Sequence, residues 1–172
     1  VPEVLVKMNR KRAVEASLVA ADALRLTVNG VTLRTTIMTG FPGETESRFR
    51  RLLADVRRMQ FDHLGVFAYS PEEGTPGATM KGRPPMKVAQ SRALKIMAAQ
   101  KKIWDRKAKA MLGAELPALV VSPGVARLES QAPDVDGVVR LGAEDAAIAP
   151  VGEVVLVRLV EVSDYDFIGE LV

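Results

Sequence analysis

The chain has 172 residues, of which 48% are hydrophobic and 26% charged, a composition typical of a globular protein with one large or two small domains. It contains no cysteine and a single histidine, which excludes disulfides, thiolate-held metals and a histidine zinc site within these residues. No apolar run approaches the ~20 residues that cross a membrane, so we expect no membrane partner.

The net charge of +3 conceals a strong asymmetry along the chain. Residues 1–114 carry 21 Lys and Arg against 10 Asp and Glu, a charge of +11, whereas residues 115–172 carry 3 against 11, a charge of −8. Such a split indicates two units with different partners. The alternative is two solvated surfaces without a partner, since charged faces often serve only solubility.

The first part of the chain has the pattern of an α/β domain. Apolar residues at helical spacing predict a helix over 11–26, and β-branched residues predict a strand over 32–38 that ends at a Gly-Phe-Pro-Gly turn, 40–43. A second helix is predicted over 46–59, where five apolar residues form one stripe and Thr45 is the expected N-cap.

Residues 63–68 predict a second strand, whose continuous apolar character suits a parallel strand covered on both faces. Strand, helix and strand in this order form a βαβ unit. Two strands are too few to fill a core, so we expect the rest of the parallel sheet to lie outside these residues. A long helix follows over 86–111, with a moderate stripe of Leu94, Met97, Lys101, Trp104 and Ala108.

From residue 116 the pattern changes to short β-rich runs separated by turn residues. The predicted strands are 116–121, 125–128, 138–141, 154–162 and 167–172. Five short strands in this length suit a small antiparallel β-barrel of OB type. We therefore expect two domains, 1–112 and 113–172.

Several segments, in the same order along the chain, resemble one protein family. They are 33–45 (LRTTIMTGFPGET), 65–76 (GVFAYSPEEGTP), 131–137 (QAPDVDG) and 163–171 (SDYDFIGEL). They are similar to segments of the RimO-type methylthiotransferases, which are radical S-adenosylmethionine (SAM) enzymes. The resemblance implies the C-terminal part of such an enzyme: the last strands of a parallel radical SAM (β/α) barrel, a connecting helix and a TRAM domain. Gly77 departs from the family, which commonly has alanine there.

The resemblance also implies an activity. The complete enzyme would be a transferase that adds a methylthio group to the β-carbon of an aspartate in small-subunit ribosomal protein twelve, in the cytoplasm. Its implied cofactors are SAM and two 4Fe-4S clusters, which carry the chemistry. The cluster cysteines lie outside this chain, so these residues alone should be inactive, and no catalytic or metal-binding residue is expected among them.

Two alternatives stay open. A MiaB-type tRNA-adenosine methylthiotransferase shares the domain order, and a non-catalytic binding module fits a chain without cluster ligands. Glu73, where the tRNA enzymes usually have a basic residue, and the ending 164–170 favour the RimO type. An acidic barrel also repels a phosphate backbone and attracts a basic ribosomal protein of the small subunit.

Four of the cofactor candidates, Met38, Gly40, Phe67 and Tyr69, lie at or just past the carboxyl ends of the two predicted parallel strands, where α/β sheets bind ligands, and the other two lie earlier in the first strand. Arg suits a carboxylate, glycine lets the backbone approach a ligand, and an aromatic ring covers a base. The candidates are Arg34, Thr36, Met38, Gly40, Phe67 and Tyr69. The structural alternatives are a simple strand-to-helix turn at 40–43 and a core role for Tyr69.

The partner candidates are carboxylates of the predicted barrel, expected to hold a basic protein. They are Asp134, Asp136, Asp164, Asp166 and Glu170. We expect the cluster of Arg48, Arg50 and Arg51 to be a solvated helix face. The alternative is that these arginines contact ribosomal RNA.

Overall fold

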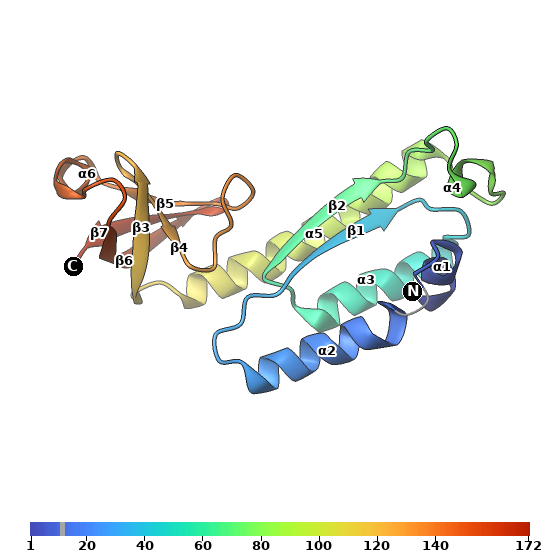
Figure 1. Ribbon diagram of the computed structural model, residues 1–172, viewed down its shortest axis with the longest axis horizontal. Helices are drawn as coiled ribbons and strands as arrows, with labels where there is room; N and C mark the ends of the chain where they lie inside the picture. The colour runs from blue at the N-terminus through green and yellow to red at the C-terminus, as the bar shows by residue number, and fades with distance from the viewer. Residues whose placement is uncertain (11–12) are drawn as a thin grey trace. The chain divides into compact units, whose positions relative to one another are not determined.

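The computed structural model describes residues 1–10 and 13–172 and divides them into two compact units, Val1–Ile103 and Trp104–Val172 (Figure 1). The predicted start of the first helix, at residues 11 and 12, lies outside the described residues. The domain limits 1–112 and 113–172 stay a prediction. None of the helices in the described part of the chain has the length and apolar character that a membrane crossing requires.

The first unit contains the predicted βαβ arrangement. Strand β1 (Arg34–Thr39) pairs in parallel with β2 (His63–Ala68), and helix α3 (Glu46–Met59) connects them. The prediction of two parallel strands is therefore confirmed. The other helices of this unit are α1 (Pro2–Lys7), α2 (Ala13–Thr27), the short α4 (Pro76–Thr79) and the first part of α5 (Met86–Ala110). The short helix α4 was not predicted.

Helix α3 forms where its sequence predicts it. The Thr45 hydroxyl accepts a hydrogen bond from the backbone N–H of Arg48 at 3.3 Å, which caps the first turn. Phe49, Val56 and Met59 are buried on one face. Phe49 and Val56 pack with residues of β2 and α5, including Leu64 and Ile96, so the helix is held by its apolar stripe.

Two expectations about burial were wrong. Strand β2 is not covered on both faces, because α3 and α5 cover only the face that contains Leu64; Phe67, on the other face, is 47% exposed. Within α5, Leu94 is 70% exposed although its spacing predicts a place in the apolar stripe. The buried positions in this part of α5 are instead Ala89, Arg92, Ile96, Gln100 and Ile103.

The second unit is a closed five-stranded barrel. Its strands are β3 (Glu115–Ser122), β4 (Val125–Leu128), β5 (Val139–Leu141), β6 (Val154–Ser163) and β7 (Asp166–Leu171), in the order β3-β4-β5-β7-β6. The predicted antiparallel barrel is wrong at one pair, since β5 and β7 run parallel. The short helix α6 (Ala143–Ile148) between β5 and β6 was not predicted.

Alternating side chains fill the barrel. Ala118 and Val120 of β3, and Val157 and Leu159 of β6, are at most 1% exposed and pack with Phe167. Their neighbours along each strand face outward, as the period of a β-strand requires. Register shifts in β3 and β6 bend these strands, which helps a small sheet to close.

Candidate functional site

One face of the β1–β2 pair is open in the first unit. Along β1, Arg34, Thr36 and Met38 alternate with Thr35 and Ile37, so the two sets point to opposite faces of the sheet. Ile37 packs into the core with α3 and α5. Arg34, Thr36 and Met38 therefore share the face that these helices leave uncovered.

The register of the two strands brings the candidates together. Thr36 lies opposite Gly65 and Met38 lies opposite Phe67. A Cβ at Gly65 would come within 3.8 Å of the Thr36 hydroxyl, so the missing side chain leaves a gap beside that hydroxyl. Four of the six predicted cofactor residues thus lie on one face: Arg34, Thr36, Met38 and Phe67.

This open face offers three kinds of contact. The exposed Phe67 ring presents a surface on which a base can stack, and Arg34 is an exposed cation that suits a carboxylate. The Thr36 hydroxyl can donate or accept a hydrogen bond. That these residues bind a cofactor stays a prediction.

Gly40 has a structural role that its sequence motif did not reveal. Its φ of +81° is in the region that favours glycine, and a Cβ there would clash with the Cβ of Ala89 on α5. Its N–H donates to the Glu44 carboxylate at 3.1 Å. The structure therefore places Gly40 against a helix of its own unit, and not on the open face.

Tyr69 follows the last residue of β2 and is buried. Its side chain is 8% exposed and its ring meets Phe41 edge-on, with 5.0 Å between centroids. Its hydroxyl has no hydrogen-bond partner within the described part of the chain. A Cβ at Gly77 would come within 2.5 Å of this hydroxyl, so the departure from alanine at Gly77 leaves room for the ring.

The residues that fix the turn after β1 were not predicted. Arg92 of α5 donates to the Glu44 carboxylate at 2.8 Å and to its backbone carbonyl at 3.0 Å. It also reaches Glu46 at 3.2 Å, and this hydrogen bond lowers the pKa of the Glu46 carboxyl. A signal was present, because Arg92 stands between Ala89 and Ile96 at helical spacing, where an apolar residue is expected.

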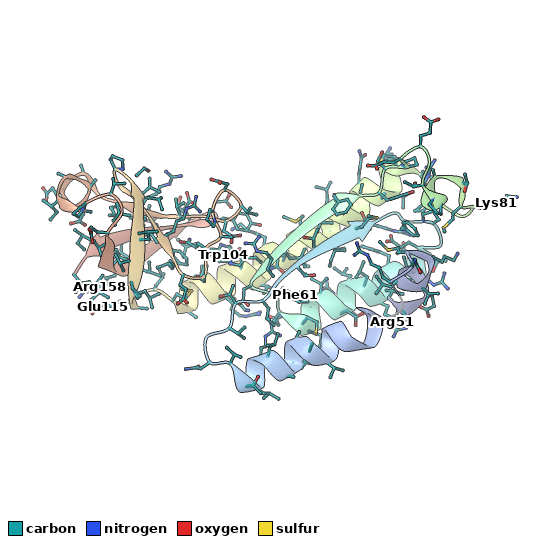
Figure 2. The ribbon with its side chains drawn as sticks, viewed as in Figure 1. Arg51, Phe61, Lys81, Trp104, Glu115 and Arg158 are labelled. Atoms are coloured by element: carbon teal, nitrogen blue, oxygen red, sulfur yellow. The ribbon has the colours of Figure 1, made fainter. Side chains whose placement is uncertain are left out.

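The three clustered arginines of α3 each have a hydrogen-bond or ion-pair partner within the first unit. Arg48 donates to the carbonyl of Gly43 at 2.7 Å, Arg50 pairs with Glu46 at 3.4 Å, and Arg51 lies 3.9 Å from Glu3. Figure 2 labels Arg51 on this helix. The arrangement is that of a helix face with local ion pairs, and the ribosomal RNA contact stays a prediction.

On the barrel, two of the partner candidates accept hydrogen bonds from backbone N–H groups. Asp136 accepts from the N–H of Ala132 at 2.8 Å, and Asp166 accepts from the N–H of Val138 at 2.9 Å. Asp166 also forms an ion pair with Arg140 at 2.7 Å. These two carboxylates stabilise the barrel's own loops.

The other three partner candidates are exposed. Asp134 and Asp164 lie in turns with positive φ angles, and Glu170 lies opposite Arg158 in the β6–β7 register. Arg158 hydrogen-bonds Glu115 at 2.6 Å (Figure 2), and this bond raises the pKa of the guanidinium. Glu170 adds a weaker effect in the same direction.

No group of three or more His, Asp or Glu side chains that could hold a metal ion occurs in residues 1–10 and 13–172. The chain also has no cysteine, so it supplies no thiolate to an iron–sulfur cluster.

Comparison with known proteins gives the family. The TRAM domain family matches residues 120–172, which include most of the barrel. The chain is 36% identical to ribosomal protein uS12 methylthiotransferase RimO of Carboxydothermus hydrogenoformans, over 99% of its own length. It is 39% identical to the RimO of Syntrophotalea carbinolica and 40% identical to that of Syntrophobacter fumaroxidans, over 98% and 99% of its length.

The chain corresponds to the C-terminal part of the RimO-type methylthiotransferases. It spans about two fifths of the length of these relatives, between 38% and 40%. The resemblance stated from the motifs is thereby confirmed. Within this RimO-type sequence, the open face belongs to the part before the TRAM domain and the acidic candidates belong to the barrel.

Proposed function

We propose that the chain is the C-terminal part of an enzyme that transfers a methylthio group to the β-carbon of an aspartate in ribosomal protein uS12. The observation that carries the proposal is the open face of β1 and β2, where Arg34, Thr36, Met38 and Phe67 meet on a parallel pair. The match to RimO proteins over nearly the whole chain supports it.

In this proposal β1, α3 and β2 are the last part of a radical SAM (β/α) barrel, and the open face is turned toward the interior of that barrel. Two exposed strand edges and one uncovered face are what a short piece of a larger parallel sheet would present. The domains are 1–112 and 113–172, and the enzyme works on ribosomal proteins in the cytoplasm.

Bound SAM and the 4Fe-4S clusters would supply the radical, methyl and sulfur chemistry. The residues of this chain would bind and orient SAM: Arg34 holds its carboxylate, Thr36 hydrogen-bonds a polar group and Phe67 stacks on the adenine. Gly40 and Tyr69 shape the turns beside this face. The clusters find no thiolate ligand in this chain, so their ligands belong to other parts of the enzyme.

The barrel would recruit the substrate protein. Its charge of −8 attracts a basic ribosomal protein and repels the phosphate backbone of tRNA. Asp134, Asp164 and Glu170 are the exposed candidates for this attraction, while Asp136 and Asp166 contribute charge from positions that also hold loops.

The test uses the complete enzyme that contains this chain, with its clusters reconstituted. It is incubated with SAM, a reductant and either uS12 or tRNA, and the products are analysed by mass spectrometry. We expect a methylthio group on an aspartate of uS12 and no change in the tRNA. Modified adenosine in the tRNA, with unmodified uS12, would establish the MiaB-type alternative.

Variants in the same assay test the open face. Arg34→Gln and Phe67→Ala should raise the SAM concentration needed for half-maximal rate. Thr35→Ser, on the opposite face of the same strand, is the matched control and should leave it unchanged. Equal SAM dependence in all three variants would contradict the proposed SAM contacts.

A further inference from the structure

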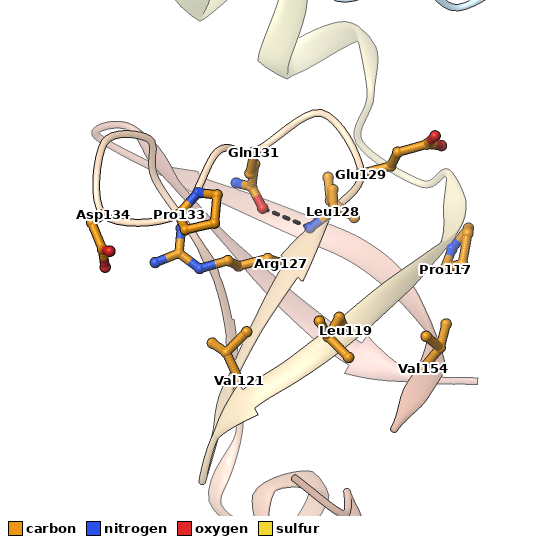
Figure 3. Close-up of a pocket in the computed structure, with 10 residues that line it drawn as sticks. All are labelled: Pro117, Leu119, Val121, Arg127, Leu128, Glu129, Gln131, Pro133, Asp134 and Val154. Carbon is orange, nitrogen blue, oxygen red and sulfur yellow. Dashed lines mark hydrogen bonds between the residues drawn. The ribbon is translucent and has the colours of Figure 1, made fainter. Parts of the chain in front are cut away.

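The barrel has a groove on its outer surface, beside β3 and the loop that follows β4. Its volume is about 670 Å³, and all the residues that line it belong to the second unit (Figure 3). Three of them are exposed apolar side chains: Leu119 is 42% exposed, Val121 37% and Val154 65%. A group of apolar side chains left open to water, together in one groove, is typical of a binding surface.

Gln131 gives this groove an unused hydrogen-bond donor. The side chain is 5% exposed, and its Oε1 accepts from the backbone N–H of Leu128 at 2.9 Å, as the dashed line in Figure 3 shows. This bond fixes the orientation of the amide. Its Nε2 has no partner within the described part of the chain, and an unpaired buried donor is unfavourable. A ligand carbonyl in the groove would satisfy it.

The charged residues of the groove leave it negative. Glu129 and Asp134 are exposed and lie on opposite sides of Leu119 in Figure 3. Arg127 also lines the groove, but its guanidinium donates to the carbonyl of Ala132 at 3.0 Å. The cation is therefore held by the loop, while the two carboxylates face solvent.

We propose that this groove binds an extended segment of a basic protein, in which an apolar side chain lies between lysine or arginine residues. The apolar side chain packs on Leu119 and Val121, and a backbone carbonyl of the segment accepts from Gln131 Nε2. The flanking cations approach Glu129 and Asp134. That the segment belongs to the enzyme's substrate protein rests on the function proposed above.

The same groove is a poor site for single-stranded nucleic acid, which needs cations and aromatic stacking surfaces. The aromatic residues of the second unit are Trp104, Tyr165 and Phe167, and none of them lines the groove. Trp104 packs against both other rings, with centroids 5.9 and 5.6 Å apart.

The test measures fluorescence anisotropy of a labelled synthetic peptide, a leucine flanked on both sides by lysines, added to the 172-residue chain. We expect Leu119→Ser to weaken binding by about tenfold, the loss typical of a central apolar contact. Glu129→Gln should weaken it severalfold at low salt. Glu144→Gln makes the same charge change on α6, outside the groove, and should leave binding unchanged.

Gln131→Glu separates the groove from simple charge attraction. Glutamate keeps an acceptor for the Leu128 N–H but replaces the free donor with an oxygen. The groove predicts weaker binding, whereas attraction by net charge alone predicts tighter binding. Tighter binding, or equal binding of a peptide with serine in place of leucine, would overturn the proposal. The proposal would also be overturned if an unlabelled oligoribonucleotide displaced the peptide from the wild-type chain but not from Leu119→Ser.

Hydrogen exchange of the wild-type chain gives a second measurement that needs no variant. Addition of the peptide should protect residues 119–121 and 128–134 and leave α6 unchanged, and protection elsewhere would contradict the site.

The methylthio assay separates this inference from the proposed function. If complete enzyme carrying Leu119→Ser modifies uS12 at the wild-type rate, the groove is not the substrate site although the function stands. If the peptide binds but uS12 is not modified, the groove proposal stands and the proposed function is rejected.

Discussion

Arg92 on α5 and Glu44 in the turn after β1 form a buried ion pair with 2.8 Å between Nη1 and Oε1. Their side chains are 7% and 4% exposed. The same carboxylate accepts from the N–H of Gly40, and the same guanidinium lies 5.2 Å from the centre of the Phe49 ring. The pair therefore joins the end of β1, the start of α3 and the helix α5.

Removing one partner of this pair should strongly destabilise the first unit. In Glu44→Ala the buried Arg92 guanidinium loses its buried counter-ion and keeps only the exposed Glu46 carboxylate, so we expect the free energy of unfolding to fall by about 3–5 kcal/mol. Helical circular dichroism in a urea titration measures this loss. The chain's only tryptophan, Trp104, lies in the second unit, so its fluorescence should report an unchanged barrel transition. Glu73→Ala, in an exposed loop, is the control, and an equal loss there would contradict the role of the pair.

Glu46 should make the stability of the first unit depend on pH in the acid range. Its hydrogen bond from Arg92, and a second from Arg50, lower its pKa below the ordinary value of 4.5. A carboxyl with a depressed folded-state pKa stabilises the fold above its unfolded pKa, and that contribution is lost as pH falls through the folded value. Wild type should therefore exceed Glu46→Gln in stability at neutral pH. Urea titrations at decreasing pH should show the difference vanish below pH 4.5, and a difference that grows on acidification would contradict this assignment.

The repeating elements of the fold could be predicted because periodicity and turn residues are local signals. Helix α3 and strand β2 have the expected bounds, and Thr45 caps α3 as predicted. The alternation of Arg34, Thr36 and Met38 along β1 is equally local, because every second residue of a strand points to the same face. The parallel β5–β7 pair was not foreseen, because strand direction within a barrel depends on contacts distant in sequence.

The roles of Gly40 and Arg92 could not be derived from local pattern. Each depends on the close approach of α5 to the end of β1, which joins residues 48 or 49 positions apart: Glu44 with Arg92, and Gly40 with Ala89. The motif 40–43 indicated a glycine turn, either open to a ligand or simply joining strand to helix. Tertiary packing gave Gly40 a different neighbour, and it left Leu94 exposed although its spacing suited a buried stripe.

Gly40→Ala should be much more harmful than the same change at Gly74. Both glycines have similar positive φ angles, +81° and +79°, so both variants carry the left-handed backbone strain of about 1–2 kcal/mol. Only at Gly40 does the new methyl group meet Ala89, which adds about 1–3 kcal/mol of overpacking. Thermal unfolding followed by circular dichroism measures both losses.

Ala89→Gly provides the double-mutant test of this contact. It removes the methyl group that Gly40→Ala would strike, so the double variant should regain part of the lost stability despite the helix penalty of the new glycine. If the double variant loses as much stability as the two single variants together, the clash is relieved in another way.

Truncation of two acidic residues of β7 should affect the stability of the barrel to very different extents. Asp166→Ala leaves the Val138 N–H without its acceptor and Arg140 without its counter-ion, so the barrel should lose about 1–3 kcal/mol. Glu170→Ala removes an exposed carboxylate, and its effect on stability should be within the narrow range typical of surface changes. Trp104 fluorescence in a urea titration measures both.

Charge reversal at Glu170 should slow the association of a basic peptide. At low salt, Glu170→Lys should bind the peptide more slowly than wild type, and added salt should remove the difference because it screens exposed charges. If Glu170→Lys associates like wild type at low salt, the acidic surface does not steer the partner, and only the loop role of Asp166 remains.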